Sequence, residues 1–396
     1  MPFHFSPINF IHYYLKREAT QFFTSIAIRY LGLGMVLIFE PIYIYLYFGR
    51  SIPLTLLFIG SIHGLFALLV VFGGKLISKI GLRHAMLFSN FFIFGYYLSL
   101  FFINISIFFV PLAILLKSIG FTLFWPAFHI DFARFSKKDH RGLQVGKLNI
   151  AVLIPTIFSP IIGGAVLAVF GYSVLFTIVL IILLISAIPL FLSKDHQELY
   201  TDSYHKAWGR MFKKINFRND LALISNSLEL SINAYLWPLF MFVMAIGYGT
   251  IGGIISFSLA ITAIFSFYAG KIADSAFRSR LLKTGSVLTS ISWVMKYFVL
   301  TPFDAFLTHA LYRISRTLAG IPFSSTFYDI AAAKEEEADE FIIYREIIHN
   351  ISRMFFLFLL AGVFLVFPKI NSFFLVAAVL SLGLMFLGDQ TKPDKK

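Results

Sequence analysis

Long apolar stretches alternate with short polar breaks along the whole chain. Runs of about 20 apolar residues, the length that an α-helix needs to cross a bilayer core, recur between Gly, Pro or charged breaks. The predicted helices span 22–48, 53–78, 85–103, 105–134, 147–169, 173–192, 219–246, 250–272, 281–301, 303–332, 342–367 and 370–388. The pattern therefore predicts an all-α membrane protein with about twelve transmembrane helices.

One longer polar segment, 193–219, separates the sixth apolar run from the seventh. It predicts an N-terminal six-helix bundle over 1–192, a cytoplasmic linker over 193–218 and a C-terminal six-helix bundle over 219–396. The linker is too short for a separate soluble domain, and we expect a short amphipathic piece around Trp208–Phe217. Residues 1–21 show no basic n-region of a signal peptide, and 2–16 predict an interfacial aromatic segment, with a disordered tail as the alternative.

A short phrase occurs twice and relates the two predicted bundles. Phe-Gly-Gly-Lys-Leu-Ile-Ser at 72–78 returns as Tyr-Ala-Gly-Lys-Ile-Ala-Asp at 268–274. Gly74 and Gly270 are 196 residues apart, about half of the 396-residue chain. Transporters are commonly built from such internal repeats, so we expect two pseudo-symmetric bundles.

Composition supports a bilayer as the solvent of this chain. Hydrophobic residues make up 58% and charged residues 13%, whereas soluble domains carry roughly 25% charge. The chain has no cysteine, which excludes disulfides, thiol catalysis and cysteine-bound metal clusters. The formal net charge of +13 would fit a nucleic-acid partner, but the distribution of the basic residues argues against one.

Lys and Arg gather on one side of the predicted helices. With the N-terminus in the cytoplasm, the inner segments hold 25 of the 33 Lys and Arg residues, and the outer loops hold only Arg50 and Lys369. This asymmetry follows the positive-inside rule. It predicts a multi-pass protein of the cytoplasmic membrane with both termini inside, a lipid bilayer as its surroundings and no nucleic acid as partner.

Charged residues within the apolar runs are the candidate functional groups, because charge inside a bilayer is costly and faces protein or water. All but one lie on the first, fourth, seventh and tenth runs, which we expect to line a shared cavity, while the third, sixth, ninth and twelfth face lipid. These residues are Arg29, Glu40, Lys117, Glu229, Lys296, Arg313 and Arg316.

Helical spacing groups polar and aromatic residues into stripes, because residues three, four, seven or eleven apart share a face. Lys117 and Arg313 are 196 residues apart, as are Pro126 and Pro322, so the repeat extends to these charges. The predicted substrate-binding residues are Lys117, Trp125, Asn226, Asn233, Trp237, His309, Arg313 and Arg316. Glu40 and Glu229 are predicted to exchange protons. The alternative is structural: the carboxylates only neutralise the cations, and Arg29 and Lys296 snorkel or pack against neighbours.

The chain resembles the major facilitator superfamily over nearly its whole length. The segment from Gly74 to Gly81, followed by Arg83, matches a loop motif of that family, with Ser78 in place of its usual Asp. The second copy keeps the acid as Asp274, and 155–164 in the fifth run looks like the proline–glycine signature of the family's exporters. The resemblance implies alternating access, in which two bundles rock around a mid-membrane site.

Two oppositely charged loops are predicted to close the cytoplasmic side. The loop at 134–141 is basic and the loop at 335–340 is acidic, so we expect them to pair across the bundles, with solvated helix ends as the alternative. The resemblance and these loops give the predicted gating residues Gly74, Ser78, Gly81, Arg83, Arg141, Gly270, Asp274 and Glu336.

These observations predict a monomeric transporter of a small polar or anionic solute, with protons as the candidate coupling ion and with no cofactor or metal. The first alternative is a drug or lipid exporter of the same fold, and a remote one is a non-transporting receptor or scaffold. An enzyme is not expected. His129 and Asp131 could form an acid–base pair, but residues two apart on a helix do not face each other.

Overall fold

The computed structural model describes residues 18–135, 141–191, 200–210, 217–273, 278–332 and 338–387. Within these ranges every regular element is a helix. The long helices are α2 (Glu18–Val36), α4 (Ile52–Ile80), α5 (Leu82–Phe102), α6 (Phe109–Phe135), α7 (Arg141–Phe191), α9 (Phe217–Ser231), α11 (Tyr248–Ala273), α12 (Arg278–Tyr297), α13 (Pro302–Ala332), α14 (Ala338–Val366) and α15 (Ser372–Gly383). Shorter pieces are α3 (Glu40–Tyr47), α8 (Tyr204–Gly209), η3 (Ile232–Leu236), α10 (Trp237–Val243) and η4 (Leu384–Phe386).

These elements form the twelve predicted helices. α2 with α3 is the first, and α9, η3 and α10 together are the seventh. The fifth and sixth are both contained in α7, whose backbone breaks at Gly171 with φ 75°, a conformation that glycine adopts without steric cost. The domain boundaries at 192 and 219 stay a prediction.

Two helices are interrupted at related places by proline. Pro41 follows the turn at residues 37–39 between α2 and α3, and Pro238 follows the π-helical turn η3. A proline has no N–H to donate to the carbonyl four residues earlier, and its ring clashes with that carbonyl. Positions 41 and 238 are 197 residues apart, close to the repeat offset, so both halves break the helix that carries their buried glutamate.

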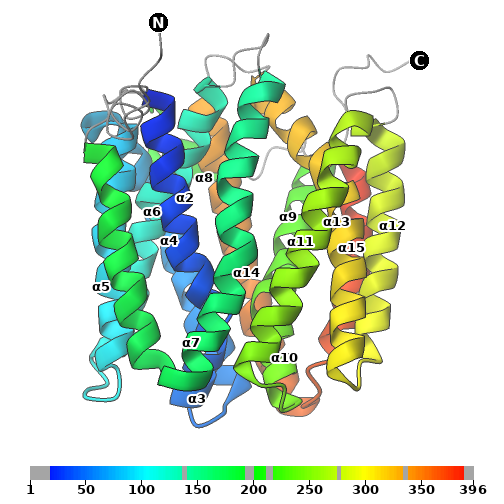
Figure 1. Ribbon diagram of the computed structural model, residues 1–396. Coiled ribbons are helices and arrows are strands. Elements are labelled where there is room, and N and C mark those ends of the chain that lie inside the picture. The colour runs from blue at the N-terminus through cyan, green and yellow to red at the C-terminus, as the bar shows by residue number, and fades with distance from the viewer. Residues whose placement is uncertain are drawn as a thin grey trace, which may run out of the picture.

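Close helix packing joins the first six helices to the last six. A Cβ on Gly252 of α11 would lie 2.3 Å from the Pro160 carbonyl oxygen of α7, and one on Gly164 of α7 would lie 2.5 Å from the Tyr248 carbonyl oxygen. The Ile161 N–H also donates to the Ser256 hydroxyl at 3.0 Å. Small residues let membrane helices approach this closely, and Figure 1 shows α7 and α11 side by side in the middle of the molecule.

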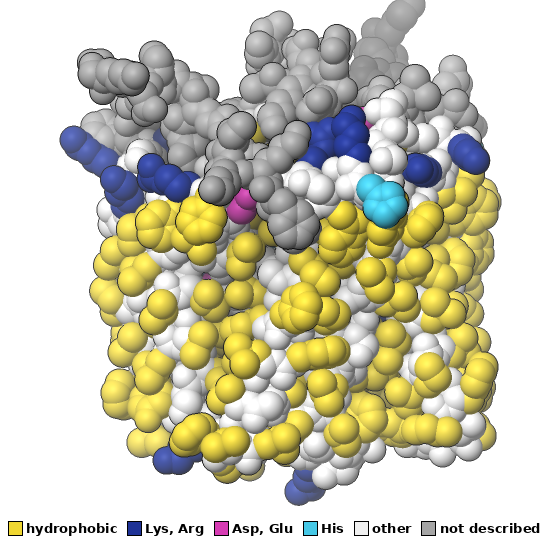
Figure 2. Space-filling view, turned by 180° about the vertical axis from the view of Figure 1, so that it is seen from behind, with side chains coloured by type: hydrophobic (Ala, Val, Ile, Leu, Met, Phe, Trp, Pro, Cys, Tyr) yellow, Lys and Arg dark blue, Asp and Glu magenta, His cyan; other side chains and the backbone are white. Residues whose placement is uncertain are grey.

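The surface has the pattern of a membrane protein. Figure 2 shows a broad hydrophobic band with Lys and Arg gathered at one end and few at the other. Six helical stretches among the described residues are long and apolar enough to cross a membrane by length and composition. The end of the bundle at which α8 lies is called the linker end below, and the opposite end, with residues 48–51, the far end.

The amphipathic piece expected around Trp208–Phe217 lies mostly outside the described residues and stays a prediction. The structure has α8 at Tyr204–Gly209, where the Ser203 hydroxyl caps the helix by accepting from the Lys206 N–H at 3.3 Å. Phe217, expected in that amphipathic piece, is the first residue of α9, and residues 211–216 lie outside the described ranges. The cap at Ser203 accounts for where α8 begins.

Candidate functional site

The first half contains a buried ion pair between Glu40 and Lys117. Glu40 begins α3, and Lys117 on α6 donates to its carboxylate; their exposed fractions are 3% and 6%. The Tyr97 hydroxyl donates to the other carboxylate oxygen at 3.0 Å, and the Lys117 ammonium lies 4.4 Å from the centre of the Tyr96 ring. Buried charges need such pairing and hydrogen bonding.

The second half contains an equivalent pair between Glu229 on α9 and Arg316 on α13. Arg316 Nε lies 3.1 Å from the Glu229 carboxylate, and Trp293 Nε1 donates to its other oxygen at 2.8 Å. Arg316 also donates to Asn226. The first and fourth helices thus carry one pair, and the seventh and tenth carry the other. The structure brings these predicted residues together as two separate pairs, one in each half.

In the second half, two partly buried arginines have no carboxylate within ion-pair distance among the described residues. Arg313 lies on α13 and Arg353 on α14, and the Nε atom of each is buried with no hydrogen-bond partner. Asn233 Oδ1 and Trp237 Nε1 are also buried and unpartnered. Buried polar atoms of this kind are rare and call for water or a ligand. Three of these four residues were predicted from the sequence to bind substrate; Arg353 was not.

A polar chain connects the two halves near the middle of the bundle. His63 on α4 contacts Asn350 Oδ1 with Nδ1 at 2.8 Å and the Tyr235 hydroxyl with Nε2 at 2.8 Å. Asn350 donates to the Glu346 carboxylate at 3.3 Å, and Glu346 accepts from Arg345 at 2.9 Å. The sequence reading missed this chain. Its signal was the stripe of Glu346, Asn350 and Arg353, which lie four and three residues apart on one helical face.

The π-helical turn places side chains from the seventh helix in this polar region. Asn233 and Tyr235 both lie within η3, and the Tyr235 hydroxyl lies 2.8 Å from Nε2 of His63, whose Nδ1 contacts Asn350 on α14. π-helical turns occur frequently at functional sites. The break before Pro238 therefore directs the seventh helix towards groups from both halves.

Lys296 is buried rather than snorkelling. Its ammonium lies 4.0–4.2 Å from the centres of three rings, those of Trp237, Trp293 and Tyr312. Its Nζ lies 3.3 Å from Nδ1 of His309. Arg29 is likewise buried and covers the Phe124 ring at 3.9 Å. Both cations therefore pack against neighbouring aromatic side chains, which was one of the structural roles considered for them.

The predicted gating residues that the structure describes lie at the linker end. Gly81 has φ 93° at the turn between α4 and α5, where other residues would be strained. The Ser78 hydroxyl accepts from the Tyr200 N–H at 2.8 Å and donates to the Gly74 carbonyl at 3.1 Å. A Cβ on Gly74 would lie 3.0 Å from Ile343 of α14. Ser78 therefore contacts the linker where the family motif would have an acid.

Only some of the remaining predicted gating residues lie within the described ranges. Arg83 lies 3.8 Å from Asp131, and both side chains are 1% exposed. Asp274 and Glu336 lie outside the described residues, as do the side chain of Arg141 and the surroundings of Gly270. The charged latch between the loops stays a prediction.

Trp125 and His129 lie on the same face of α6, towards the linker end. Their rings stack with centroids 5.8 Å apart, and His129 Nε2 lies 3.0 Å from Arg345 Nη1. Asp131 contacts Arg83 instead. The two members of the considered acid–base pair thus have different neighbours, as expected for residues two apart on a helix.

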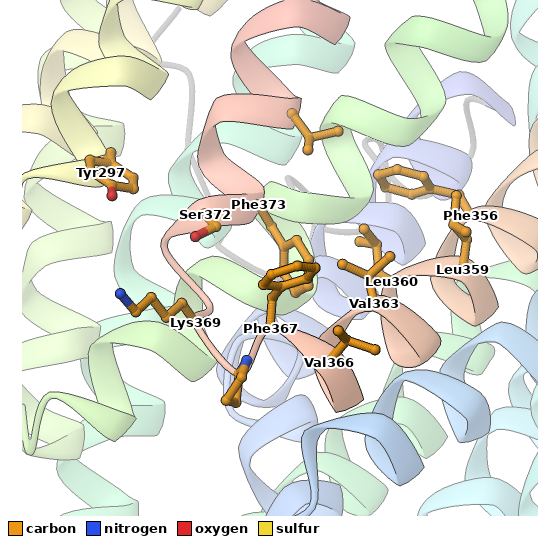
Figure 3. Close-up of a pocket in the computed structure, with 12 residues that line it drawn as sticks. Tyr297, Phe356, Leu359, Leu360, Val363, Val366, Phe367, Lys369, Ser372 and Phe373 are labelled. Atoms are coloured by element: carbon orange, nitrogen blue, oxygen red, sulfur yellow. The ribbon is translucent and has the colours of Figure 1, made fainter.

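A separate cleft of about 570 Å³ lies at the far end, between α14 and α15. Figure 3 shows its wall of Phe and aliphatic side chains, with Lys369, Ser372 and Tyr297 at one side. None of the paired charges described above contributes to it. The cleft is therefore an apolar feature distinct from the polar region of the bundle.

Comparison with known proteins defines the class. The model of the Major Facilitator Superfamily matches residues 22–338. The chain belongs to this superfamily, a membrane transporter class. No curated protein matches it.

Solved structures confirm the fold. The human organic anion transporter MFSD10 (TETRAN) is similar with a TM-score of 0.69 and 12% identity, over 94% of this chain and 99% of that one. The E. coli fucose:proton symporter FucP is similar with a TM-score of 0.64 and 11% identity, over 94% and 98% of the two chains. At these identities the likeness is one of fold.

Proposed function

We propose that this protein moves a small organic anion across the cytoplasmic membrane by alternating access, with the linker end in the cytoplasm. This proposal is supported chiefly by the distribution of charge in the buried region of the bundle. Glu40, Glu229, Asp131 and Glu346 each have a cationic neighbour. Arg313 and Arg353 have no carboxylate partner among the described residues, so this region has positive charge left over for an anionic solute.

Arg313 is the proposed principal anion-binding group. A guanidinium offers several donors in a planar arrangement that suits carboxylate and phosphate oxygens. The unpartnered amide oxygen of Asn233 and indole N–H of Trp237 would accept from and donate to the polar parts of the solute. Arg353, next to the cross-half chain, is the proposed second cation.

Alternating access requires the hydrogen bonds between the two halves to break and re-form. Movement of the two halves against each other has to break the hydrogen bonds of His63 to Tyr235 and Asn350, because their partners lie on opposite halves. A solute that binds one arrangement better shifts the population towards it. The Glu40–Lys117 and Glu229–Arg316 pairs each lie within one half, so they can persist through this movement.

A thermal-shift screen of the purified protein tests the anion assignment. Organic acids, sugars, amino acids, nucleosides and drugs would be compared at two pH values. We expect anionic compounds to raise the unfolding temperature of the wild type, and the Arg313→Gln variant to lose this response. Stabilisation by neutral sugars alone, or an unchanged response in the variant, would contradict the assignment.

A drug or lipid exporter of the same fold is the second candidate. The observation in its favour is the apolar cleft in Figure 3, whose wall includes Val366 and Phe367, which are 70% and 66% exposed. Such a cleft would accept an apolar substrate from the lipid. In the same screen this candidate predicts stabilisation by apolar drugs that survives Arg313→Gln.

A further inference from the structure

Two buried bases lie together in the second half, apart from the paired carboxylates. Lys296 lies in the last turn of α12 and His309 lies on α13, and their exposed fractions are 0% and 2%. Lys296 Nζ and His309 Nδ1 are 3.3 Å apart. No carboxylate among the described residues lies within ion-pair distance of Lys296. The nearby Glu229 is engaged by Arg316 and Trp293.

Two opposing effects act on a positive charge at the two bases: burial without a carboxylate partner disfavours the charged form, whereas the surrounding aromatic rings attract a cation. Three aromatic rings surround the Lys296 ammonium, and ring faces attract cations. The His309 ring is stacked on Trp237, with centroids 5.8 Å apart and an interplanar angle of 12°. Aromatic faces attract a cation less strongly than a carboxylate does in an ion pair. The two bases can therefore lose their proton as well as bind it.

Hydrogen-bond chemistry limits how many protons the pair can hold. An ammonium has three donors and no acceptor, and an imidazolium has two donors and no acceptor. A hydrogen bond between Nζ and Nδ1 therefore requires one of the two nitrogens to offer a lone pair. Either a charged Lys296 donates to a neutral His309, or a charged His309 donates to a neutral Lys296. The hydrogen-bonded pair holds at most one positive charge, and its titration belongs to the pair.

The charged groups facing the pair come from two elements. Glu229 on α9 accepts a hydrogen bond from Trp293, whose ring the Lys296 ammonium contacts, and Arg313 lies on α13 together with His309. Tyr312 on α13 supplies a phenol ring. On the remaining side α15 has no titratable residue between Ser372 and Gly383. Arg313 lies four residues after His309, on the same helical face, so a solute bound at Arg313 would change the charge beside the pair.

We propose that Lys296 and His309 form a one-proton binding site whose occupancy is coupled to an anion bound at Arg313. An anion there cancels the charge of Arg313, so the pair then retains its proton more tightly. By linkage, the protonated pair binds the anion more tightly by the same factor. Such cooperative binding favours transport of proton and anion in the same direction. The inference rests on the proposed function. It assigns proton coupling to Lys296 and His309 instead of Glu40 and Glu229, for which the sequence predicted it.

A ligand-free titration tests the site directly. The full-length protein, in lipid nanodiscs and labelled with ¹³C,¹⁵N-histidine and ¹⁵N-lysine, would be followed by NMR between pH 5 and 9. His309 and Lys296 would be assigned from the signals lost in His309→Gln and Lys296→Met. We expect one coupled titration step that both residues report. Absence of any step at both nitrogens would overturn the proposal.

Removing the neighbouring charge imitates a bound anion. Arg313→Gln should move the midpoint of the step upwards by about one pH unit or more, since a charge about one helical turn away contributes on that scale. Arg313→Lys keeps the charge and should leave the midpoint in place. Arg29→Gln, which removes a buried cation from the other half, is the matched control and should also leave it in place. An unchanged midpoint in Arg313→Gln would overturn the coupling.

A second variant keeps the proposal falsifiable if Arg313→Gln does not fold. Lys296→Arg installs a cation that does not deprotonate, so the step should disappear from His309, while Lys369→Arg at the far end should retain it. A step that persists in Lys296→Arg would overturn the proposal. Because no anion is added, a failed titration concerns the proton site alone. A failed solute screen beside a successful titration would overturn the proposed function instead.

Discussion

At the scale of single residues, buried carboxylates and cations are matched within each half. Glu40 has Lys117 and Tyr97, and Glu229 has Arg316 and Trp293. Removing one partner of a buried pair leaves an uncompensated charge, which costs about 3–5 kcal/mol, whereas replacing both is often close to neutral. Loss of one partner from either pair should therefore lower the stability of the protein more than loss of both partners.

Lys117→Met should destabilise the protein by about 3 kcal/mol, because the Glu40 carboxyl group would stay buried without its cationic partner. The Glu40→Gln, Lys117→Met double variant should recover most of the loss. The free energy of unfolding in detergent, measured for the wild type, both single variants and the double variant, checks this. A double variant as unstable as Lys117→Met would show that the two residues do not act as a pair.

The sequence identifies which residues are buried charges but not which of them are partners. Ionisable groups are so rare in apolar runs that Glu40, Lys117, Glu229 and Arg316 stand out directly. Their pairing depends on helix rotation, and the partners lie 77 and 87 positions apart. His63 was missed because a single histidine in a long apolar run has no local signal, and its partner Asn350 lies 287 positions away.

At the scale of elements, prolines and glycines determine where helices break and how closely they approach. Twelve helices follow from apolar run length, and the break before Pro41 and the π-helical turn before Pro238 follow from the missing N–H. The close approach of α7 to α11 depends on which face each glycine occupies. That face is known only from the packed structure, where Gly252 meets the Pro160 carbonyl.

Gly252→Ala and Gly253→Ala should have opposite effects. A Cβ at Gly252 would lie 2.3 Å from a backbone oxygen, whereas one at Gly253 meets only a Phe257 ring atom at 4.0 Å. Overpacking costs about 1–3 kcal/mol, while alanine is favoured over glycine within a helix by up to about 1 kcal/mol. Thermal unfolding of the two adjacent variants compares them directly. Equal stability of the two would contradict the close contact between α7 and α11.

The linker segment 200–210 is a second element with its own stabilising contacts. It contacts α4 through Tyr200 and Ser78 and α14 through Thr201 and Glu340. Within the segment, Asp202 accepts from Arg210 at 2.7 Å. Burial alone would raise the pKa of Asp202, but hydrogen bonds from Arg210 and Lys206 lower it overall.

Asp202 should hold the linker in place at neutral pH and release it in acid. A carboxyl group whose pKa is lowered on folding stabilises the fold above its unfolded pKa, about 3.9, and this contribution is lost as the pH falls through the folded value. Because the chain has no cysteine, a spin label at His205→Cys can report the mobility of α8. It should be immobile at pH 7 in the wild type and mobile in Asp202→Asn. A label equally immobile in both would contradict the role of Asp202, and a label at Lys369→Cys is the control.

At the scale of the whole molecule, two sets of six helices meet along α4 with α14 and α7 with α11. The repeat offset and the one-sided distribution of Lys and Arg predict this arrangement from sequence alone. The meeting of polar groups from both halves at His63, Tyr235 and Asn350 could not be predicted. It depends on the relative placement of the halves, to which no local pattern contributes.

The central claim is that this superfamily member transports a small anion that binds at Arg313. The most direct measurement is uptake by proteoliposomes from a mixture of organic acids, sugars, amino acids and nucleosides, with the contents identified by mass spectrometry. Wild-type vesicles should accumulate at least one carboxylate- or phosphate-bearing solute, and Arg313→Gln vesicles should not, while Arg29→Gln vesicles behave as the wild type. Accumulation of neutral solutes only, or anion uptake that is unchanged in Arg313→Gln, would contradict the account.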